Sequence, residues 1–332
     1  MTSTSTVDTA ALEEAIQDHI DRADAELGVC LRHVESGLEV LVRPDDLYPM
    51  ASVFKIPVLI ETLAQVDEGR QSLDTRIVLR QEDKVLPSGI LVELQAGLQP
   101  TLHDLLTLMI IISDNTATDL VLQQIGIPSV EQRLRSFGCN AVSLKMSVRG
   151  LFDATFVSPD VSLLPHEITR LLMEQGRDWE CVTNQRTLEN NVASPRDMAL
   201  LLERLLEGEL LSPESTRVAL DILLRQQLNL RMPRFLPPTV PVAHKTGTFL
   251  QSRNDAGIIY LPDGTHLVLV TFAILDRTRL ESDPLVLMPY LDQVDSAMGH
   301  IARSAYDAFT AGEPVRVDPA VDNARSRNQP VS

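Results

Sequence analysis

The sequence predicts an α/β protein, in which a mixed β-sheet flanked by the two terminal helices lies beside an all-helical domain. Strand patterns occur near both ends of the chain, and helical patterns fill its middle. Sheet segments on either side of a helical insert indicate one sheet built from both chain ends. We therefore expect a sheet domain over 1–56 and 235–312, a helical domain over 57–234 with an insert around 152–190, and a disordered tail over 313–332.

The first part of the chain shows a helix and then two strands. The helix is expected over 9–25, where apolar residues recur at helical spacing: Leu12, Ala15, Ile16 and Ile20. Val29 and Leu31 then alternate with other residues as in a strand, and Val40 and Val42 lie on the returning strand. A turn at 36–37 joins the two strands into a hairpin.

The middle of the chain contains recognisable helix ends. Four pairs of residues are typical of helix starts: Thr101 with Asp104, Ser129 with Gln132, Ser194 with Pro195, and Ser212 with Pro213. Gly126 and Gly138 stand where helices are expected to end. From 240 onward strand patterns return, with apolar runs at 256–261 and 265–274 around a Pro-Asp-Gly turn. A closing helix is expected over 285–309.

Composition excludes some classes of partner. The 332 residues are 44 % apolar and carry a net charge of −17, which argues against a nucleic-acid backbone or an anionic membrane. The given start has no secretory signal, and no apolar run is long enough to span a membrane. If no leader precedes this sequence, we expect a cytoplasmic protein with three buried reduced thiols: Cys30, Cys139 and Cys181.

Three short motifs occur in one order along the chain. They are Ser52-Val53-Phe54-Lys55, Ser113-Asp114-Asn115 and Lys245-Thr246-Gly247. Each is common by chance, but the ordered set S-x-x-K, S-D-N and K-T-G is the signature of class A β-lactamases and penicillin-binding proteins. The set predicts nucleophilic catalysis by a serine.

The first motif supplies a nucleophile and a base. Ser52 is expected to begin a helix, so that Lys55 lies one turn further along the same face. A serine hydroxyl becomes nucleophilic when a neighbouring base takes its proton, and a lysine with a lowered pKa is such a base. The helix start also directs free backbone N–H groups toward a developing oxyanion.

The other two motifs are expected to face the nucleophile. Ser113 would relay a proton to the leaving nitrogen, and Asn115 would bind a substrate amide. Lys245 would attract a substrate carboxylate and lower the pKa of Lys55. The remaining expected substrate contacts are Thr246, Gly247 (which would leave space for the substrate along the strand) and Thr248 (whose N–H would be the second oxyanion donor).

From about 11 to 309 the chain resembles the serine β-lactamase-like and penicillin-binding-protein-like family, closest to class A. The stretches 115–120, 194–199 and 254–258 are similar to that family as well. The resemblance implies a serine hydrolase that forms an acyl-enzyme, with Ser52 as nucleophile, Lys55 as base, Ser113 as proton relay and Lys245 as electrostatic anchor. By the same resemblance, Arg231 or Arg253 would bind a substrate carboxylate.

One departure from class A concerns deacylation. Those enzymes carry a water-activating glutamate in an E-x-x-L-N stretch, and here the corresponding stretch, 147–151, reads Ser-Val-Arg-Gly-Leu. Three glutamates in or near the insert are candidate replacements for that base, although the alternative reading of each is an ordinary surface residue: Glu174, Glu180 and Glu189.

Three functions therefore remain open on the sequence. The first is β-lactamase-like amide hydrolysis through an acyl-enzyme on Ser52. The second is a carboxypeptidase, esterase or acyltransferase with slow or no β-lactam turnover, and the third is a non-catalytic ligand-binding homologue. The expected partner is a small-molecule or peptide-like substrate with an amide or ester bond and a carboxylate. We expect no cofactor and no metal, and His244 is interpreted as a strand residue rather than a ligand; the oligomeric state is not indicated.

Overall fold

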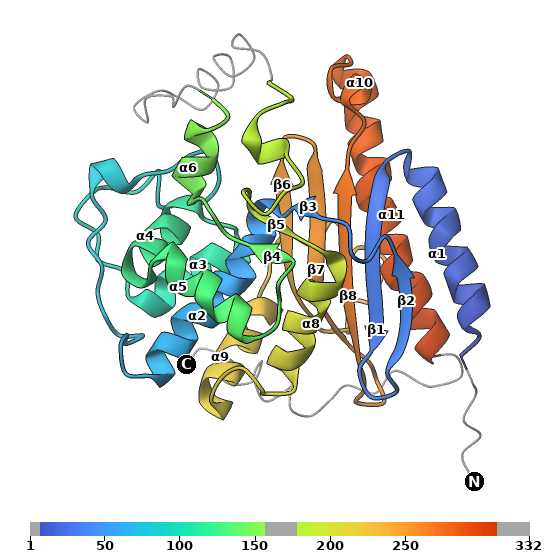
Figure 1. The fold of residues 1–332 in the computed structure, drawn as a ribbon, viewed down its shortest axis with the longest axis horizontal. Coiled ribbons are helices and arrows are strands. Elements are labelled where there is room, and N and C mark those ends of the chain that lie inside the picture. Colours follow the sequence, from blue (N-terminus) through green and yellow to red (C-terminus); the bar gives the residue numbers. More distant parts are fainter. Residues whose placement is uncertain (1–6, 157–177, 311–332) are drawn as a thin grey trace, which may run out of the picture.

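The computed structural model describes residues 7–156 and 178–310. The predicted tail over 313–332 and the central part of the predicted insert, 157–177, lie outside the described residues. Figure 1 shows a sheet with two long helices on one side and a group of helices on the other, which confirms the predicted α/β fold class.

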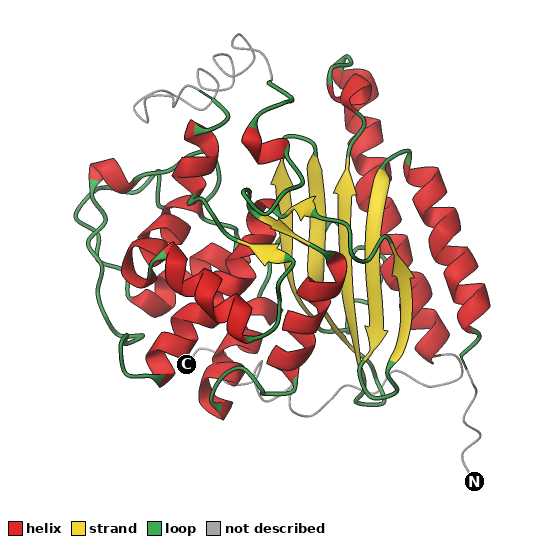
Figure 2. Cartoon of the chain, in the orientation of Figure 1, coloured by secondary structure: helices red, strands yellow, loops and turns green. Residues whose placement is uncertain are grey.

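Five strands form the main sheet in the order β2-β1-β8-β7-β6 (Figure 2). Their bounds are β1 Glu26–His33, β2 Leu38–Val42, β6 Val242–Phe249, β7 Ser252–Tyr260 and β8 His266–Ile274. Every neighbouring pair is antiparallel, so the expectation of a mixed sheet is corrected. For three of these pairs the reason is connectivity: short turns join β1 to β2 and the last three strands to one another, and such turns permit only antiparallel pairing. The β1–β8 pair joins segments from the two ends of the chain.

Both faces of this sheet are buried. Val29 and Leu31 lie in one apolar cluster with the terminal helices α1 (Thr9–Ala23) and α11 (Pro284–Thr310). Their neighbour Cys30 lies in a second cluster, shared with the helical side of the molecule. Because successive side chains of a strand point to opposite faces, the alternation of these residues places one layer of helices on each side. The three cysteines are buried and free, as predicted.

The helical side contains the elements that carry the motifs. Its helices are α2 Lys55–Asp67, α3 Leu102–Ile111, α4 Asn115–Ile125, α5 Ile127–Ser136, α6 Val148–Asp153, α8 Pro195–Leu206 and α9 Pro213–Leu224, with short turns η1 Ala51–Phe54, η2 Gln81–Asp83 and η3 Val182–Asn184. A separate short helix, α10 Arg277–Leu280, precedes α11.

Most predicted helix ends are confirmed. The side chains of Thr101, Ser194 and Ser212 cap α3, α8 and α9, as the sequence patterns indicate. The expected start at Ser129 is wrong, because α5 begins at Ile127 with Gly126 as its N-cap. Proline fixes a helical φ and needs no N–H partner in the first turn, so Pro128 moves the start two residues earlier.

A small second sheet fixes the entry to α2. Its strands are β3 Tyr48–Pro49, β4 Val142–Ser143 and β5 Val192–Ala193, in the order β3-β5-β4. Tyr48 pairs with Ala193, and the next backbone N–H, that of Met50, donates to Asn191 O at 2.9 Å. The segment that leads to Ser52 is thus held by backbone bonds to the chain just before α8.

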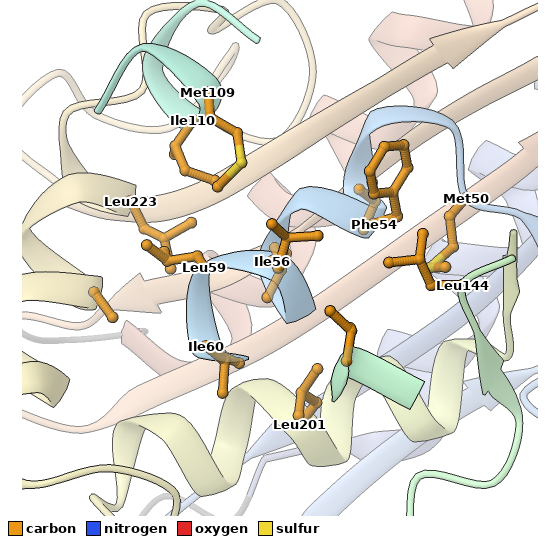
Figure 3. Packing of buried hydrophobic residues seen from close by; sticks show 14 of the residues in the cluster. Met50, Phe54, Ile56, Leu59, Ile60, Met109, Ile110, Leu144, Leu201 and Leu223 are labelled. Carbon is orange, nitrogen blue, oxygen red and sulfur yellow. The ribbon is translucent and has the colours of Figure 1, made fainter. Parts of the chain in front are cut away.

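Helix α2 is the centre of the larger apolar cluster. Figure 3 shows Ile56, Leu59 and Ile60 of this helix among side chains from α3, α8 and α9. Leu59 has no exposed surface. The last residue of the first motif, Lys55, therefore begins a helix that is enclosed by the core, and the other three lie in the turn directly before it, which favours a rigid site. No helix in the two described ranges is long and apolar enough to cross a membrane.

Leu59→Ala should lower the free energy of unfolding by about 2–5 kcal/mol, because it leaves a cavity in this cluster. Urea denaturation followed by circular dichroism measures the change. Leu285→Ala is the matched control: Leu285 is 86 % exposed, so its substitution should cost less than about 0.5 kcal/mol. Equal losses in the two variants would contradict the central place of α2 in the core.

Candidate active site

Ser52 lies in a tight turn between β3 and α2. The turn η1 is a 3₁₀ helix, and α2 begins at Lys55, so Ser52 does not itself begin the α-helix as predicted. The cause is local: the Asn254 side chain donates to Pro49 O and Met50 O, both at 2.9 Å, and Ala51 has a φ of 45°. These contacts wind the chain more tightly than an α-helix allows. Ser52 still immediately precedes the positive end of α2.

Gly247 lies against this turn. A Cβ atom at Gly247 would come within 2.5 Å of Met50 O and 3.2 Å of the backbone N of Val53. The sequence predicts that Gly247 leaves space for a substrate, but in the structure the Ser52 turn occupies that space. Glycine is needed here because β6 packs directly on the backbone that presents the nucleophile.

The Ser113-Asp114-Asn115 turn joins α3 to α4. Ser113 has a φ of 59°, in the left-handed region that is costly for a residue with a side chain. Asp114 holds it there: one carboxylate oxygen accepts from Ala117 N at 2.8 Å, and the other accepts from Ile90 N at 2.7 Å and Leu91 N at 2.9 Å. The middle residue of the motif is therefore a clamp, a role that the sequence patterns did not reveal.

Lys55 connects the first motif to the second. Its fully buried ammonium donates to Ser113 O at 2.8 Å, Ser113 Oγ at 3.1 Å and Asn115 Oδ1 at 3.0 Å. Burial lowers the pKa of Lys55 to about 7, against the opposing effect of the Asp114 and Asp119 carboxylates. A large fraction of Lys55 is then uncharged at neutral pH and able to accept a proton.

Lys245 lies behind the site rather than in it. Its side chain is fully buried and donates to Thr246 O at 2.7 Å. Burial, together with the nearby charge of Lys55, holds the pKa of Lys245 well below its usual value. Two amines therefore share one buried region, where the charge of Lys55 disfavours a charged Lys245. The sequence predicts that Lys245 lowers the pKa of Lys55, but in the structure burial is the cause of that lowering.

The two candidate arginines are bound within the protein. Arg231 Nε donates to Asp295 at 2.7 Å, Nη1 to Gly247 O at 2.8 Å and Asn254 O at 2.7 Å, and Nη2 to Thr248 Oγ1 at 2.6 Å. Arg253 pairs with the other oxygen of Asp295 at 2.9 Å. Neither arginine lines the cavity at Ser52. Arg231 contacts the cavity wall indirectly, by its hydrogen bond to the hydroxyl of the lining residue Thr248.

A cavity of about 350 Å³ opens at Ser52. The motifs supply one part of its wall, with Ser52, Ser113, Asn115, Thr246 and Thr248. The rest of the wall is formed by Ser88 and by apolar side chains: Ala51, Phe54, Pro87, Val148, Leu151, Phe152, Phe156, Leu228, Phe249 and Leu250. No ionisable side chain is among these lining residues, all of which belong to the described chain.

The glutamates proposed as the deacylation base do not lie in this wall. Glu180 is exposed and pairs with Arg277 at 2.8 Å, and Glu189 is exposed and does not line the cavity. Glu174 lies outside the described residues. The nearby carboxylate of Asp119 accepts from Val148 N at 2.7 Å and Arg149 N at 2.9 Å, so it holds the start of α6. Burial raises the pKa of Asp119.

A buried histidine and aspartate lie beside Lys245. His244 Nδ1 is 2.9 Å from Asp255 Oδ1, and Nε2 is 3.1 Å from Asn229 Oδ1. Although burial opposes it, the His244 contact lowers the pKa of Asp255. This pair joins the side chains of β6 and β7. Within 7–156 and 178–310, no group of three or more His, Cys, Asp or Glu side chains is arranged to hold a metal ion.

The chain matches the model of the β-lactamase enzyme family over residues 11–309. The chain belongs to that family. It is 26 % identical to β-lactamase VEB-1 of Pseudomonas aeruginosa over 285 residues, which cover 82 % of this chain and 85 % of that protein. It is 29 % identical to a β-lactamase of Streptomyces albus G over 278 residues, 80 % of this chain and 79 % of that one.

Solved structures of this family share the fold. A β-lactamase from Sphaerobacter thermophilus superposes with a TM-score of 0.72 at 30 % identity, over 93 % of this chain and all of that one. The penicillin-binding protein PBP-A superposes with a TM-score of 0.71 at 25 % identity, over 91 % of this chain and 96 % of that one. The predicted resemblance is confirmed, and this β-lactamase-family member is a serine hydrolase.

Gly247→Ala should lower the free energy of unfolding by about 1–3 kcal/mol, because the added methyl overlaps the Ser52 turn. Gly150→Ala is the matched control, since a Cβ at Gly150 would meet Met146 Cβ only at 3.4 Å and the site is helical. Urea denaturation compares the two. If Gly247→Ala were as stable as Gly150→Ala, the packing of β6 on the nucleophile turn would be refuted.

Proposed function

We propose that this chain acylates Ser52 with an amide or ester substrate and releases the acyl group slowly. The observation that supports this proposal most strongly is the state of Lys55, a buried amine with a pKa of about 7. Lys55 lies one helical turn after Ser52 and is hydrogen-bonded to Ser113. In the first step Lys55 takes the Ser52 Oγ proton while the Oγ–C bond forms. The backbone N–H groups of Ser52 and Thr248 stabilise the oxyanion.

Ser113 supports the second part of acylation. The bond from the carbonyl carbon to the leaving group breaks, and the leaving atom takes the electron pair and needs a proton. Ser113 Oγ is 3.1 Å from Lys55 Nζ and lines the same cavity as Ser52. It can pass the proton from Lys55 to the leaving group, which returns Lys55 to its uncharged form.

Substrate binding is assigned to hydroxyl and amide groups. We infer that Thr246 and Thr248 bind a substrate carboxylate, since both line the cavity and neither Lys245 nor Arg231 does. The bond from Arg231 to Thr248 Oγ1 leaves the hydroxyl proton free to donate outward. Asn115 uses Oδ1 for Lys55 and one Nδ2 hydrogen for Leu86 O, so its second hydrogen is available to a substrate carbonyl.

Deacylation has no comparable support. Water attack on the ester requires a base, and the residues of the described chain that line the cavity have only neutral and apolar side chains. This favours the second candidate of the sequence analysis, an enzyme that acts on a non-lactam amide or ester and turns over β-lactams slowly. A variant of PBP-A has been solved as an acyl-enzyme with penicillin G, which is consistent with a related protein retaining the adduct. Cytoplasmic location stays a prediction from sequence.

Incubation with penicillin G should give a persistent adduct that intact-mass spectrometry detects, with little turnover of a chromogenic cephalosporin. Ser52→Ala should remove the adduct, because no other group supplies the nucleophile. Ser88→Ala is the matched control, since Ser88 lines the same cavity without a role in the chemistry, and it should still be labelled. Fast cephalosporin turnover would instead favour a true β-lactamase, and no adduct at all would favour a binding protein.

The acylation rate constant should rise about tenfold per pH unit up to about pH 7 and level off above it. The sign follows from Lys55: its lowered pKa means that the uncharged, proton-accepting form appears as pH rises through about 7. Quenched-flow sampling with mass spectrometry measures the rate from about pH 5.5 to 9. The penicillin opening rate without protein is the control, and a profile that falls with pH would overturn the role of Lys55.

A further inference from the structure

Aromatic side chains are concentrated at the proposed nucleophile. The chain has eight phenylalanines, and four of them line the cavity at Ser52: Phe54, Phe152, Phe156 and Phe249. Three of these form a group that we call the phenylalanine cluster, namely Phe152, Phe156 and Phe249. The ring of Phe249 meets that of Phe152 edge-on at 5.2 Å and that of Phe156 at 6.4 Å.

The phenylalanine cluster is only partly buried. Phe54 is closed off in the core, whereas the three rings of the cluster are half-buried and face the cavity. Leu228 continues the same wall and is 43 % exposed. Partly exposed rings that converge on a cavity gain free energy when an apolar group displaces water from them.

The described part of the wall around the phenylalanine cluster offers no charged partner to an ionic ligand. Among the residues that the structure describes, no lysine, arginine or histidine lines the cavity, and Arg231 and Lys245 are hydrogen-bonded within the protein. A carboxylate at the phenylalanine cluster would lose water without gaining a charged partner. Polar recognition is confined to Thr246, Thr248 and Asn115, on the part of the wall that the motifs supply.

We propose that the acyl group transferred to Ser52 is uncharged and apolar, an aryl or aliphatic chain that rests on the phenylalanine cluster. The natural substrate is then an amide or ester of such an acid, and any carboxylate it carries is on the side of Thr246 and Thr248. This inference rests on the proposed acylation of Ser52 and adds the chemical class of the substrate to it.

The test uses para-nitrophenyl esters of acetic, butyric and hexanoic acid with the full chain. Attack by Ser52 forms the serine ester and expels para-nitrophenolate with its electron pair, so a coloured burst measures acylation. The acylation efficiency should rise about fourfold per added methylene, which corresponds to about 0.8 kcal/mol for each buried CH₂ at about 1.4 kcal/mol per tenfold. The mono-ester of succinic acid should be slower than the butyrate, because its acyl chain ends in a carboxylate.

Two variants locate the effect. Phe249→Ala should flatten the dependence of the acylation efficiency on acyl-chain length, because it removes a ring against which the longer chains rest. Phe309→Ala is the matched control: Phe309 is also half-buried, but it stacks on His33 at 4.5 Å, away from the cavity. Leu228→Lys places a cation at an exposed part of the wall and should invert the preference between butyrate and succinate esters.

The outcomes separate this inference from the proposed function. Equal bursts with all three chain lengths, or an undiminished slope in Phe249→Ala, would overturn the apolar acyl group and leave acylation of Ser52 intact. A burst that survives Ser52→Ala, or no burst with any ester and no penicillin adduct, would instead overturn the acylation itself. A slope that is lost in Phe249→Ala and kept in Phe309→Ala supports the inference.

Discussion

The buried ammonium of Lys55 is the constraint on which the site depends. A lysine without exposed surface must place its donors on nearby acceptors, and here they are Ser113 O, Ser113 Oγ and Asn115 Oδ1. These bonds tie the start of α2 to the turn between α3 and α4. The turn must then stay in its left-handed conformation, and the Asp114 clamp provides the bonds that keep it there. This one network fixes Lys55, Ser113 and Asn115 relative to one another.

Because Lys55 is buried, other charged groups and the strand β6 pack closely around it. Lys245 lies in the same region, and the charge of Lys55 adds to the desolvation that lowers the pKa of Lys245. Strand β6 carries Lys245 against the Ser52 turn, and only a glycine at 247 permits that approach. The carboxylates of Asp114 and Asp119 oppose the pKa shift of Lys55 through space, while both accept hydrogen bonds from backbone N–H groups.

Local patterns predicted much of the fold and the identity of the motif residues. At the helix starts, the side chains of Ser194 and Ser212 each accept a hydrogen bond from the backbone N–H three residues later, and such short-range contacts can be predicted from the sequence. The sequence does not show that Arg231 is bonded within the protein, because its partner Asp295 is 64 residues away and only folding brings the two together. The tight turn at Ser52 likewise depends on Asn254, 204 residues from the carbonyl of Met50 that it holds. Sequence identifies the chemical groups here, and tertiary contacts decide which of them face the substrate.

The two parts of the cavity wall have opposite consequences for the two half-reactions. Acylation needs a proton acceptor and hydroxyl groups, and those come from the motifs, which the β-lactamase family shares. Deacylation needs a water molecule with a base beside it. The stretch 147–151, which by resemblance corresponds to the class A glutamate motif, lies at the start of α6, and this helix contributes Val148, Leu151 and Phe152 to the wall. An apolar wall favours the binding of an apolar acyl group because it buries apolar surface. The same wall lacks a polar group that could hold and activate a water molecule. The slow release and the apolar acyl selectivity that we propose would therefore have one physical origin, the apolar side chains that α6 contributes to the cavity wall.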